Sequence, residues 1–386
     1  MPQRPFIAAS NRARVERILI VGAGIGGLSL AIALRHRGLS AEIVERADKG
    51  AGTGAGLYLV GLGTRALAGL GLADAAVSEG RINRTQTFRN HRGGRLAELD
   101  VDAYWASCGP CLGLQRVVLH RLLVEKVGSW QIRFGVTVGA LQQQPEQVSV
   151  HFTDGSDDTY DLVVGADGIR SSIRRLEFGE SDPQFRGQVG WRFIARCPAG
   201  ITGWTVFLGA GSAFLFLPIG GDRVYCYADR IATRPIADPP EGRVERLRGI
   251  FRHFANPVRE VLAQIDSPEQ LHFSAIEEVV HEPWGRGRVV LIGDAAHAMS
   301  PNMACGAAMA FEDALVLADL ITQDGAASEI VPEYIRRRSA RVNWVRRQTN
   351  GRDRLRTLPA IIRDPFLRLL VERTYRANYQ PLLAPP

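Results

Sequence analysis

Three glycines near the start of the chain have the spacing of a phosphate-binding turn. Gly22, Gly24 and Gly27 follow the apolar run RILIV and open a stretch with helical apolar spacing. Glycines so placed allow a tight turn, a close backbone approach to a diphosphate, and close packing of helix on strand. Glu45, which ends the next apolar run, can accept hydrogen bonds from ribose hydroxyls. The pattern predicts a dinucleotide site and does not by itself distinguish NAD from FAD.

Two later segments also place an aspartate beside a glycine at the end of an apolar strand. In DLVVGADGIRSS these residues are Asp167 and Gly168, and in GRVVLIGD they are Gly293 and Asp294. Each carboxylate can accept a hydrogen bond from a sugar hydroxyl, and each following turn can offer backbone N–H groups. These segments bear on which dinucleotide the chain binds.

The three motifs, in this order, resemble those of the single-component, group A flavoprotein monooxygenases, the class typified by para-hydroxybenzoate hydroxylase. The resemblance covers nearly the whole chain and is closest to the salicylate- and 6-hydroxynicotinate-hydroxylase-like branch. It implies FAD as the bound cofactor, NADH or NADPH as a transient reductant, and dioxygen as a substrate. The implied reaction hydroxylates or epoxidises a small aromatic or heteroaromatic compound through a flavin hydroperoxide. The alternatives are a flavin-dependent dehydrogenase or oxidase on the same scaffold and a non-catalytic flavin-binding protein.

The resemblance also assigns cofactor contacts to residues outside the glycine turn. Asp294 matches an aspartate that binds the ribityl chain of FAD, and Arg116 matches an arginine that contacts the cofactor. The loop that begins at Pro301 is implied to border the flavin ring, and the N-terminus of the next helix is implied to face the ring's pyrimidine end. The candidate cofactor-binding residues are Gly22, Gly24, Ile25, Gly26, Gly27, Glu45, Arg46, Arg116, Asp167, Gly168, Gly293, Asp294, Pro301, Gly306, Ala307 and Ala308.

The chain departs from the family's pattern beside the expected flavin ring. Ala304 and Cys305 stand where the family usually has Gly-Gln, so we expect the backbone geometry of this loop to differ. Gly61 and Leu62 replace a common Pro-Asn, a change that concerns the pocket wall rather than the fold.

Aromatic residues on alternating segments are the candidates for a substrate pocket. They either wall a cavity over the flavin or form ordinary sheet core. These residues are Phe214, Phe216, Tyr225 and Tyr227. No catalytic residue is assigned, and the candidates are His297, Pro301 and Tyr225. His297 is either a proton-transfer group or, as is more usual in this motif, a packed and hydrogen-bonded residue.

The elements that must position these residues alternate between strand and helix in the first part of the chain. That order predicts a parallel sheet, whereas residues 183–281 have the alternation of β-rich structure. We predict an α/β fold with a Rossmann-like, GR2-type FAD-binding domain, an inserted β-sheet-rich substrate domain and C-terminal helices. The predicted boundaries are 1–16 for a flexible arm, 17–83, 110–182 and 282–330 for the FAD-binding domain, 84–109 and 183–281 for the substrate domain, and 331–386 for the C-terminal helical region.

Local patterns add four predictions within these domains. They predict a helix over residues 64–80, a hairpin over 86–100, a helix near 244–264 and a helix over 306–322. The glycine-rich segment 61–72 shows no preceding strand and no acidic partner, so we expect no separate domain for NADH or NADPH.

The charge of the chain is basic, with a formal net charge of +7 at pH 7, and only Lys49 and Lys126 are lysines. The arginines of segment 336–347 lack a recognised nucleic-acid module or a stacking platform. We therefore expect a solvated helix face with acidic partners and no nucleic-acid partner.

The cysteine count is odd, at five, and no apolar run has secretory or membrane-spanning length. We expect a cytoplasmic monomer or homodimer with reduced thiols and no transmembrane segment. Cys108 and Cys111 have the CxxC spacing, but no thioredoxin-like unit surrounds them, so a redox role is not expected. The scattered histidines predict no metal site.

Overall fold

The first domain is built on a parallel sheet. The computed structural model describes residues 15–48, 55–128, 131–179, 182–323 and 326–386, so nearly all of the expected arm 1–16 lies outside the described residues. Six strands lie in the order β18-β19-β12-β1-β2-β8, and all neighbours are parallel except β18 and β19. Their bounds are β1 Ile18–Val21, β2 Glu42–Glu45, β8 Ile132–Phe134, β12 Leu162–Gly165, β18 Gly285–Arg286 and β19 Val289–Leu291.

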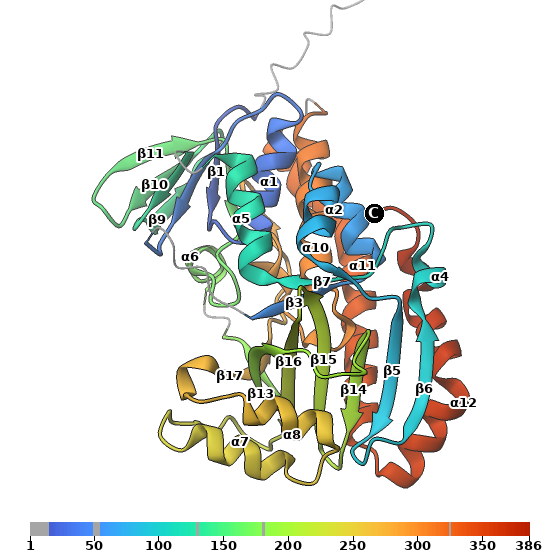
Figure 1. The fold of residues 1–386 in the computed structure, drawn as a ribbon. Helices are drawn as coiled ribbons and strands as arrows, with labels where there is room; N and C mark the ends of the chain where they lie inside the picture. The colour runs from blue at the N-terminus through green and yellow to red at the C-terminus, as the bar shows by residue number, and fades with distance from the viewer. Residues whose placement is uncertain (1–14, 49–54, 129–130, 180–181, 324–325) are drawn as a thin grey trace, which may run out of the picture.

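Helices pack beside this sheet because its central strands are apolar on both faces. All four side chains of β1 are buried, as are those of β12. Helix α1 packs against α10 and α5, and Figure 1 shows all three beside the sheet. Their bounds are α1 Ile25–Arg35, α5 Arg116–Val127 and α10 Gly306–Ile321. The prediction of a helix over residues 306–322 is confirmed.

The second domain is a seven-stranded sheet in the order β17-β13-β16-β15-β14-β5-β6, with only the β14–β5 pair parallel. The predicted hairpin over residues 86–100 is confirmed by the antiparallel β5–β6 pair. The bounds are β5 Thr85–Asn90, β6 Arg95–Asp100, β13 Gln184–Arg196, β14 Trp204–Leu208, β15 Ser212–Gly220, β16 Arg223–Ile231 and β17 His272–Glu278.

One face of this sheet turns toward the first domain and the other is covered by two short helices, α7 Arg243–Phe251 and α8 Asn256–Ala263 (Figure 1). The prediction of helical structure near residues 244–264 is confirmed, and the stretch consists of two helices rather than one. Pro257 lies in the first turn of α8, where its missing N–H costs nothing, and the chain turns between the helices.

The predicted helix over residues 64–80 is also two helices, α2 Gly61–Gly69 and α3 Ala73–Glu79, because Gly71 adopts a φ of +65° between them. The expectation that no strand precedes residue 61 is wrong, since β3 Gly56–Leu59 ends just before α2. That strand pairs antiparallel with β7 Leu112–Gln115, as does β4 Arg81–Ile82. The segment therefore lacks the parallel-sheet context of a dinucleotide turn.

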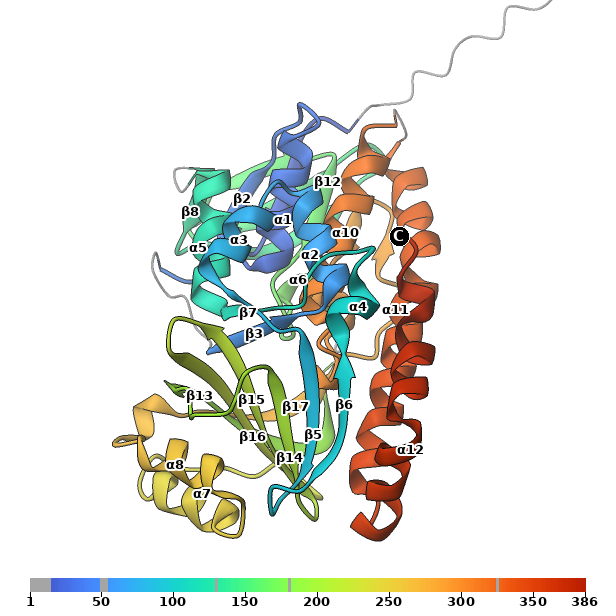
Figure 2. The same ribbon diagram turned by 45° about the vertical axis from the view of Figure 1, so that its right-hand side comes forward.

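The C-terminal helices form a hairpin along one edge of the molecule. Figure 2 shows α11 Ala327–Thr357 and α12 Ala360–Tyr379 side by side, with α12 packed against β6. Among the described helices, none combines the length and the hydropathy needed to cross a bilayer. The remaining elements are α4 Val101–Trp105, α6 Ser172–Phe178, α9 Asp294–His297, the strands β9 Val138–Gln143, β10 Val148–Phe152 and β11 Asp157–Tyr160, and the 3-10 turns η2 Pro268–Gln270, η3 Pro301–Met303 and η4 Gln380–Leu382.

Candidate flavin site

The three predicted motifs meet at one edge of the parallel sheet. Strands β1, β12 and β19 are neighbours, so the turns that follow them lie at the same carboxyl edge. A Cβ on Gly22 would lie 2.6 Å from the carbonyl oxygen of Ala166, and a Cβ on Gly293 would lie 3.2 Å from Cβ of Ala310. The glycines thus let the turns and α10 approach each other closely.

The glycine turn has the geometry that a diphosphate site requires. A Cβ on Gly27 would lie 2.0 Å from the carbonyl oxygen of Gly22, so only glycine lets α1 start this close to β1. At Gly24 a Cβ would meet nothing within 4 Å, which leaves space in front of the first turn of α1. Glu45 lies beside this turn, where its Oε2 accepts from the N–H of Ala23 at 2.8 Å. The residues present therefore fit a dinucleotide here.

The two aspartates at the strand ends differ in what they bind. Asp167 is occupied within the protein, because its carboxylate accepts from the N–H of Ser172 at 2.6 Å and the hydroxyl of Ser171 at 2.5 Å. Those bonds satisfy the N-terminus of α6. Asp294 is exposed and makes no hydrogen bond or ion pair within the described part of the chain. Asp294 is thus the carboxylate that is free to accept from a cofactor hydroxyl.

The loop expected to border the flavin is held in an uncommon backbone conformation. Ala304 has φ 52° and ψ 31°, and among the described residues it is the one non-glycine residue with positive φ. The left-handed region is thus kept although the family's glycine is absent. Cys305 follows at the start of α10, and burial raises the pKa of its thiol to about 12. It is an inert thiol that fills space.

We expect Ala304→Gly to stabilise the apoprotein by about 0.5–1 kcal/mol. Alanine in the left-handed conformation costs roughly 1–2 kcal/mol, and glycine removes this cost. Part of the gain is lost again because glycine has the larger entropy in the unfolded chain. Chemical denaturation of the flavin-free protein measures the difference. Ala307→Gly, in the first turn of the right-handed α10, is the control, and it is expected to destabilise by about 0.5–1 kcal/mol. If both variants lost the same free energy of unfolding, the backbone at Ala304 would not be strained.

The catalytic candidate His297 lies in a buried ion-pair network. Its Nε2 lies 2.6 Å from Oδ2 of Asp313, and Oδ1 of Asp313 accepts from Nε of Arg338 at 2.8 Å. The N–H of Gly293 donates to the same carboxylate at 2.9 Å. Burial alone would raise the pKa of Asp313, but its neighbours His297 and Arg338 outweigh this and lower it well below its usual value. The contacts of His297 thus tie the Gly293 turn to α10 and α11.

Two pairs of predicted pocket residues lie on opposite faces of the seven-stranded sheet. Phe214 and Phe216 pack under α7 and α8, with the ring of Phe214 5.3 Å from that of Phe251. Tyr225 and Tyr227 point to the first domain, where a Cβ on Gly56 would lie 2.2 Å from the ring of Tyr225. Leu215 pairs with Tyr227 across the two strands, and Leu215 points to the face opposite to Phe214 and Phe216, so the two pairs cannot both face the flavin. Phe214 and Phe216 are therefore no longer pocket candidates.

Positive groups gather at the face that carries the two tyrosines. The guanidinium carbon of Arg192 lies 5.2 Å from the ring centroid of Tyr227. Burial raises the pKa of Tyr225, and the nearby charges of Arg192 and Arg116 oppose that shift. Arg116 and Arg46 are both exposed, and the charge of Arg116 reaches Tyr225 of the second domain.

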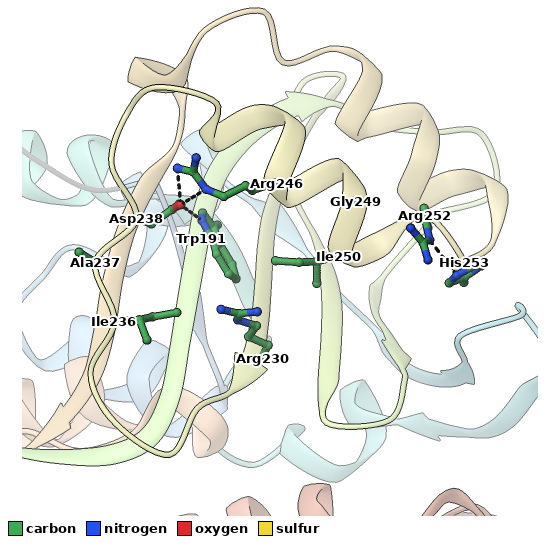
Figure 3. A pocket seen from close by; sticks show the side chains of 10 residues that line it. All are labelled: Trp191, Arg230, Ile236, Ala237, Asp238, Arg246, Gly249, Ile250, Arg252 and His253. Carbon is green, nitrogen blue, oxygen red and sulfur yellow. Dashed lines mark hydrogen bonds and ion pairs between the residues drawn. The ribbon is translucent and has the colours of Figure 1, made fainter.

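A pocket of about 490 Å³ lies on the other face of the sheet, between α7 and the strands β13 and β16 (Figure 3). Trp191 and Arg246 both donate to Asp238 there, at 2.6 and 2.8 Å. The sheet separates this pocket from Tyr225, so it is not the flavin site.

Comparison with known proteins decides the family. A sequence model described as FAD binding domain matches residues 16–349. The chain belongs to this family. The 2-heptyl-3-hydroxy-4(1H)-quinolone synthase of Pseudomonas aeruginosa is 34% identical over 336 residues, which cover 86% of this chain and 87% of that protein. The aurachin C monooxygenase/isomerase of Stigmatella aurantiaca is 31% identical and covers 84% of this chain and 86% of that protein.

The fold of this FAD-binding family member matches that of a solved relative. The structure of Klebsiella pneumoniae HpxO complexed with FAD and uric acid has a TM-score of 0.88 and 25% identity, and it covers 96% of this chain and 97% of that chain. The predictions of the α/β fold, of FAD as cofactor and of a group A flavoprotein monooxygenase are confirmed.

The flavoprotein's C-terminal helices hold the flavin loop, a role that sequence reasoning missed. Arg352 of α11 donates to the carbonyl of Asn302 at 3.0 Å, and Asp353 accepts from the amide of Asn302. The hydroxyl of Tyr379 in α12 donates to the carbonyl of Met303 at 2.8 Å. The long sequence separation leaves no local pattern that could have revealed these contacts.

Several arginines of α11 pair with acidic residues, as expected, but the expectation of a solvated face is wrong for part of the run. Arg338 is fully buried, and Arg341 binds Glu312 at 2.7 Å with a side chain that is only 10% exposed. Arg336 alone matches the expectation closely, with a side chain that is 73% exposed beside Glu333. The ion pairs of Arg338 and Arg341 fasten α11 to α10.

Proposed function

We propose that this flavoprotein uses NADH or NADPH and dioxygen to hydroxylate a fused nitrogen heteroaromatic compound of the 4-quinolone type. A relative that is 34% identical over most of both chains is a 2-heptyl-3-hydroxy-4(1H)-quinolone synthase. A second relative of the same fold is solved with uric acid, another fused nitrogen heterocycle. Both relatives support a flat heteroaromatic substrate rather than a simple phenol.

The single observation that carries this proposal is the hydroxyl of Tyr227. It is buried on the face toward the first domain and has no hydrogen-bond partner in the described residues. Burial raises the pKa of Tyr227, so the phenol stays protonated and can donate to a ring carbonyl. A buried hydroxyl without a partner is costly, and a substrate carbonyl would satisfy it.

The chain's own residues supply position and electrostatics. Bound FAD supplies hydride acceptance and oxygen activation. Asp294 would accept from the ribityl chain, Gly24 would leave room for the diphosphate, and the positive N-terminus of α10 at Gly306 would stabilise negative charge on the ring. Arg116 and Arg192 keep the space between the domains positive, which favours an anionic or carbonyl-bearing ring. Pro301, Ala307 and Ala308 complete the proposed flavin loop, and Tyr225 forms part of the pocket wall.

The proposal also includes the location and the oligomeric state that the sequence predicts. We infer a cytoplasmic monomer or homodimer without a nucleic-acid partner, and the domain boundaries given above stay predictions.

The test is turnover by the yellow, FAD-loaded protein. We expect 4-quinolones to stimulate consumption of NADH or NADPH and to yield a product that gains one oxygen atom by mass spectrometry. A product with the same oxygen count and two fewer hydrogens would indicate a dehydrogenase or oxidase instead. If NADH or NADPH is consumed but no ring compound tried is converted to a product, the substrate proposal is overturned.

We expect Tyr227→Phe to lower kcat/KM roughly 3–10-fold, the value of one hydrogen bond of about 0.5–1.5 kcal/mol. Stability should not fall, because the lost hydroxyl has no partner within the protein. Phe216→Leu, on the opposite face of the sheet, is the matched control. It should lower the melting temperature and leave kcat/KM of the folded enzyme unchanged. If kcat/KM of Tyr227→Phe equals the wild-type value, Tyr227 does not bind the substrate.

A further inference from the structure

The outer face of α12 carries apolar side chains that no described residue covers. Nine large apolar side chains are exposed in the described part of the chain, and five of them fall within residues 358–370. These five are Leu358, Ile361, Ile362, Leu369 and Leu370. The other four lie on separate elements, which is normal for a protein surface. Four of the five lie on α12 and Leu358 lies two residues before it, and such a concentration calls for a specific explanation.

The exposed residues form a stripe because of their helical spacing. Ile361, Pro365 and Leu369 follow at four-residue steps, and Ile362 lies beside them. Ile361 is 84% and Leu369 80% exposed. We call Leu358, Ile361, Ile362 and Leu369 the α12 stripe.

The opposite face of α12 fixes the helix to the protein. Leu367 is buried against the seven-stranded sheet, and Arg363 donates to the carbonyl of Gly209 at 2.7 Å. Figure 2 shows α12 along the outer edge of the molecule. The stripe is therefore held outward by contacts on the other face, and it is not needed for packing.

Arginines surround the stripe. Arg354, Arg368 and Arg373 are exposed and make no ion pair in the residues that the structure describes. An exposed apolar stripe with flanking arginines is typical of helices that lie in a membrane interface, where guanidinium groups bind lipid phosphates. The two carboxylates of α12, Asp364 and Glu372, already pair with Arg363 and Arg376, so the charge left beside the stripe is positive. The charge pattern thus favours an anionic partner surface.

We propose that the α12 stripe docks this flavoprotein onto the surface of an anionic phospholipid bilayer. The apolar side chains enter the headgroup boundary, and the flanking arginines bind phosphates. Because no described helix can cross a bilayer, this binding is peripheral and reversible. The proposal does not depend on the substrate proposed above.

The experiment is co-sedimentation of the full-length, FAD-loaded protein with lipid vesicles. We expect binding to vesicles of equal parts phosphatidylcholine and phosphatidylglycerol, weak binding to phosphatidylcholine alone, and loss of binding at high salt. Ile361→Asp combined with Leu369→Asp should weaken vesicle binding by at least about tenfold. The matched control is Val280→Asp, which changes a 51% exposed side chain outside the stripe and should bind as the wild type does.

Retained FAD and an unchanged melting temperature will show that the double variant is folded, since both side chains are exposed. Arg368→Ala combined with Arg373→Ala should weaken only the binding to anionic vesicles. The proposal is overturned if the wild type does not sediment with anionic vesicles, or if the double variant sediments equally well. It is also overturned if the wild type is a lipid-independent dimer that the double variant makes monomeric, because the stripe would then join two copies.

Discussion

Asp313→Asn is expected to lower the free energy of unfolding by about 3–5 kcal/mol, the usual cost of removing one partner from a buried ion pair. Asp313 is fully buried, and its carboxylate binds Arg338, His297 and the N–H of Gly293 at once. The amide keeps the shape of the carboxylate, but it removes the charge and replaces one acceptor oxygen by an NH2 donor. The guanidinium of Arg338, which is also fully buried, would then depend on Glu312 alone. Urea denaturation of the FAD-loaded protein measures the loss.

The pH dependence of this loss follows from the lowered pKa of Asp313. A carboxyl group whose folded-state pKa is lowered stabilises the fold above its unfolded value, near pH 3.9, and loses that contribution as the pH falls. The difference between wild type and Asp313→Asn should therefore be full at pH 7 and shrink below about pH 4.

The control for the charge effect is Glu333→Gln. Glu333 pairs with Arg336 at 2.5 Å on the exposed side of α11. Screening by water makes such a pair weak, so this variant should unfold at the wild-type urea concentration. If Asp313→Asn were no less stable than Glu333→Gln, the buried network would not be what holds α11 to α10.

Much of the first domain could be predicted from the sequence because local patterns determine it. The apolar runs of β1, β12 and β19 each end at a glycine or aspartate, and parallel strands bring those ends to one edge. The same logic could not assign the aspartates their roles. Asp167 caps α6 through the serines that follow it, whereas Asp294 has no such partner. That difference is visible only in three dimensions.

The sheet faces and the tail could not be predicted for a different reason. Alternation along a strand predicts that Phe214 and Phe216 share one face and that Tyr225 and Tyr227 share one face. It does not tell which face meets the first domain, because both faces are apolar and α7 and α8 cover one of them. The sequence alone predicts a solvated Arg338, because the residues that bind it lie on α10, 25 and 26 residues away in the sequence. In both cases the deciding neighbour comes from another part of the chain.

Gly24→Val is expected to weaken FAD binding about a hundredfold or more, equivalent to about 2.7 kcal/mol, while the protein still folds. Gly24 has φ −80° and ψ −172°, an extended conformation that any residue adopts. A Cβ there meets no protein atom within 4 Å, so the protein itself has room for valine. The added methyl groups would occupy the space in front of α1, where the diphosphate must approach the backbone. Flavin fluorescence titration of the apoprotein measures the affinity.

The matched control is Gly249→Val in α7, where a Cβ also meets nothing within 4 Å. This residue lies on the far side of the seven-stranded sheet, so FAD affinity should stay at the wild-type value. Melting of the two apoproteins separates folding from binding: both variants should unfold near the wild-type temperature. If Gly24→Val bound FAD as tightly as Gly249→Val, the diphosphate could not lie at the turn of residues 22–27. That result would require a different path for the cofactor across the sheet edge.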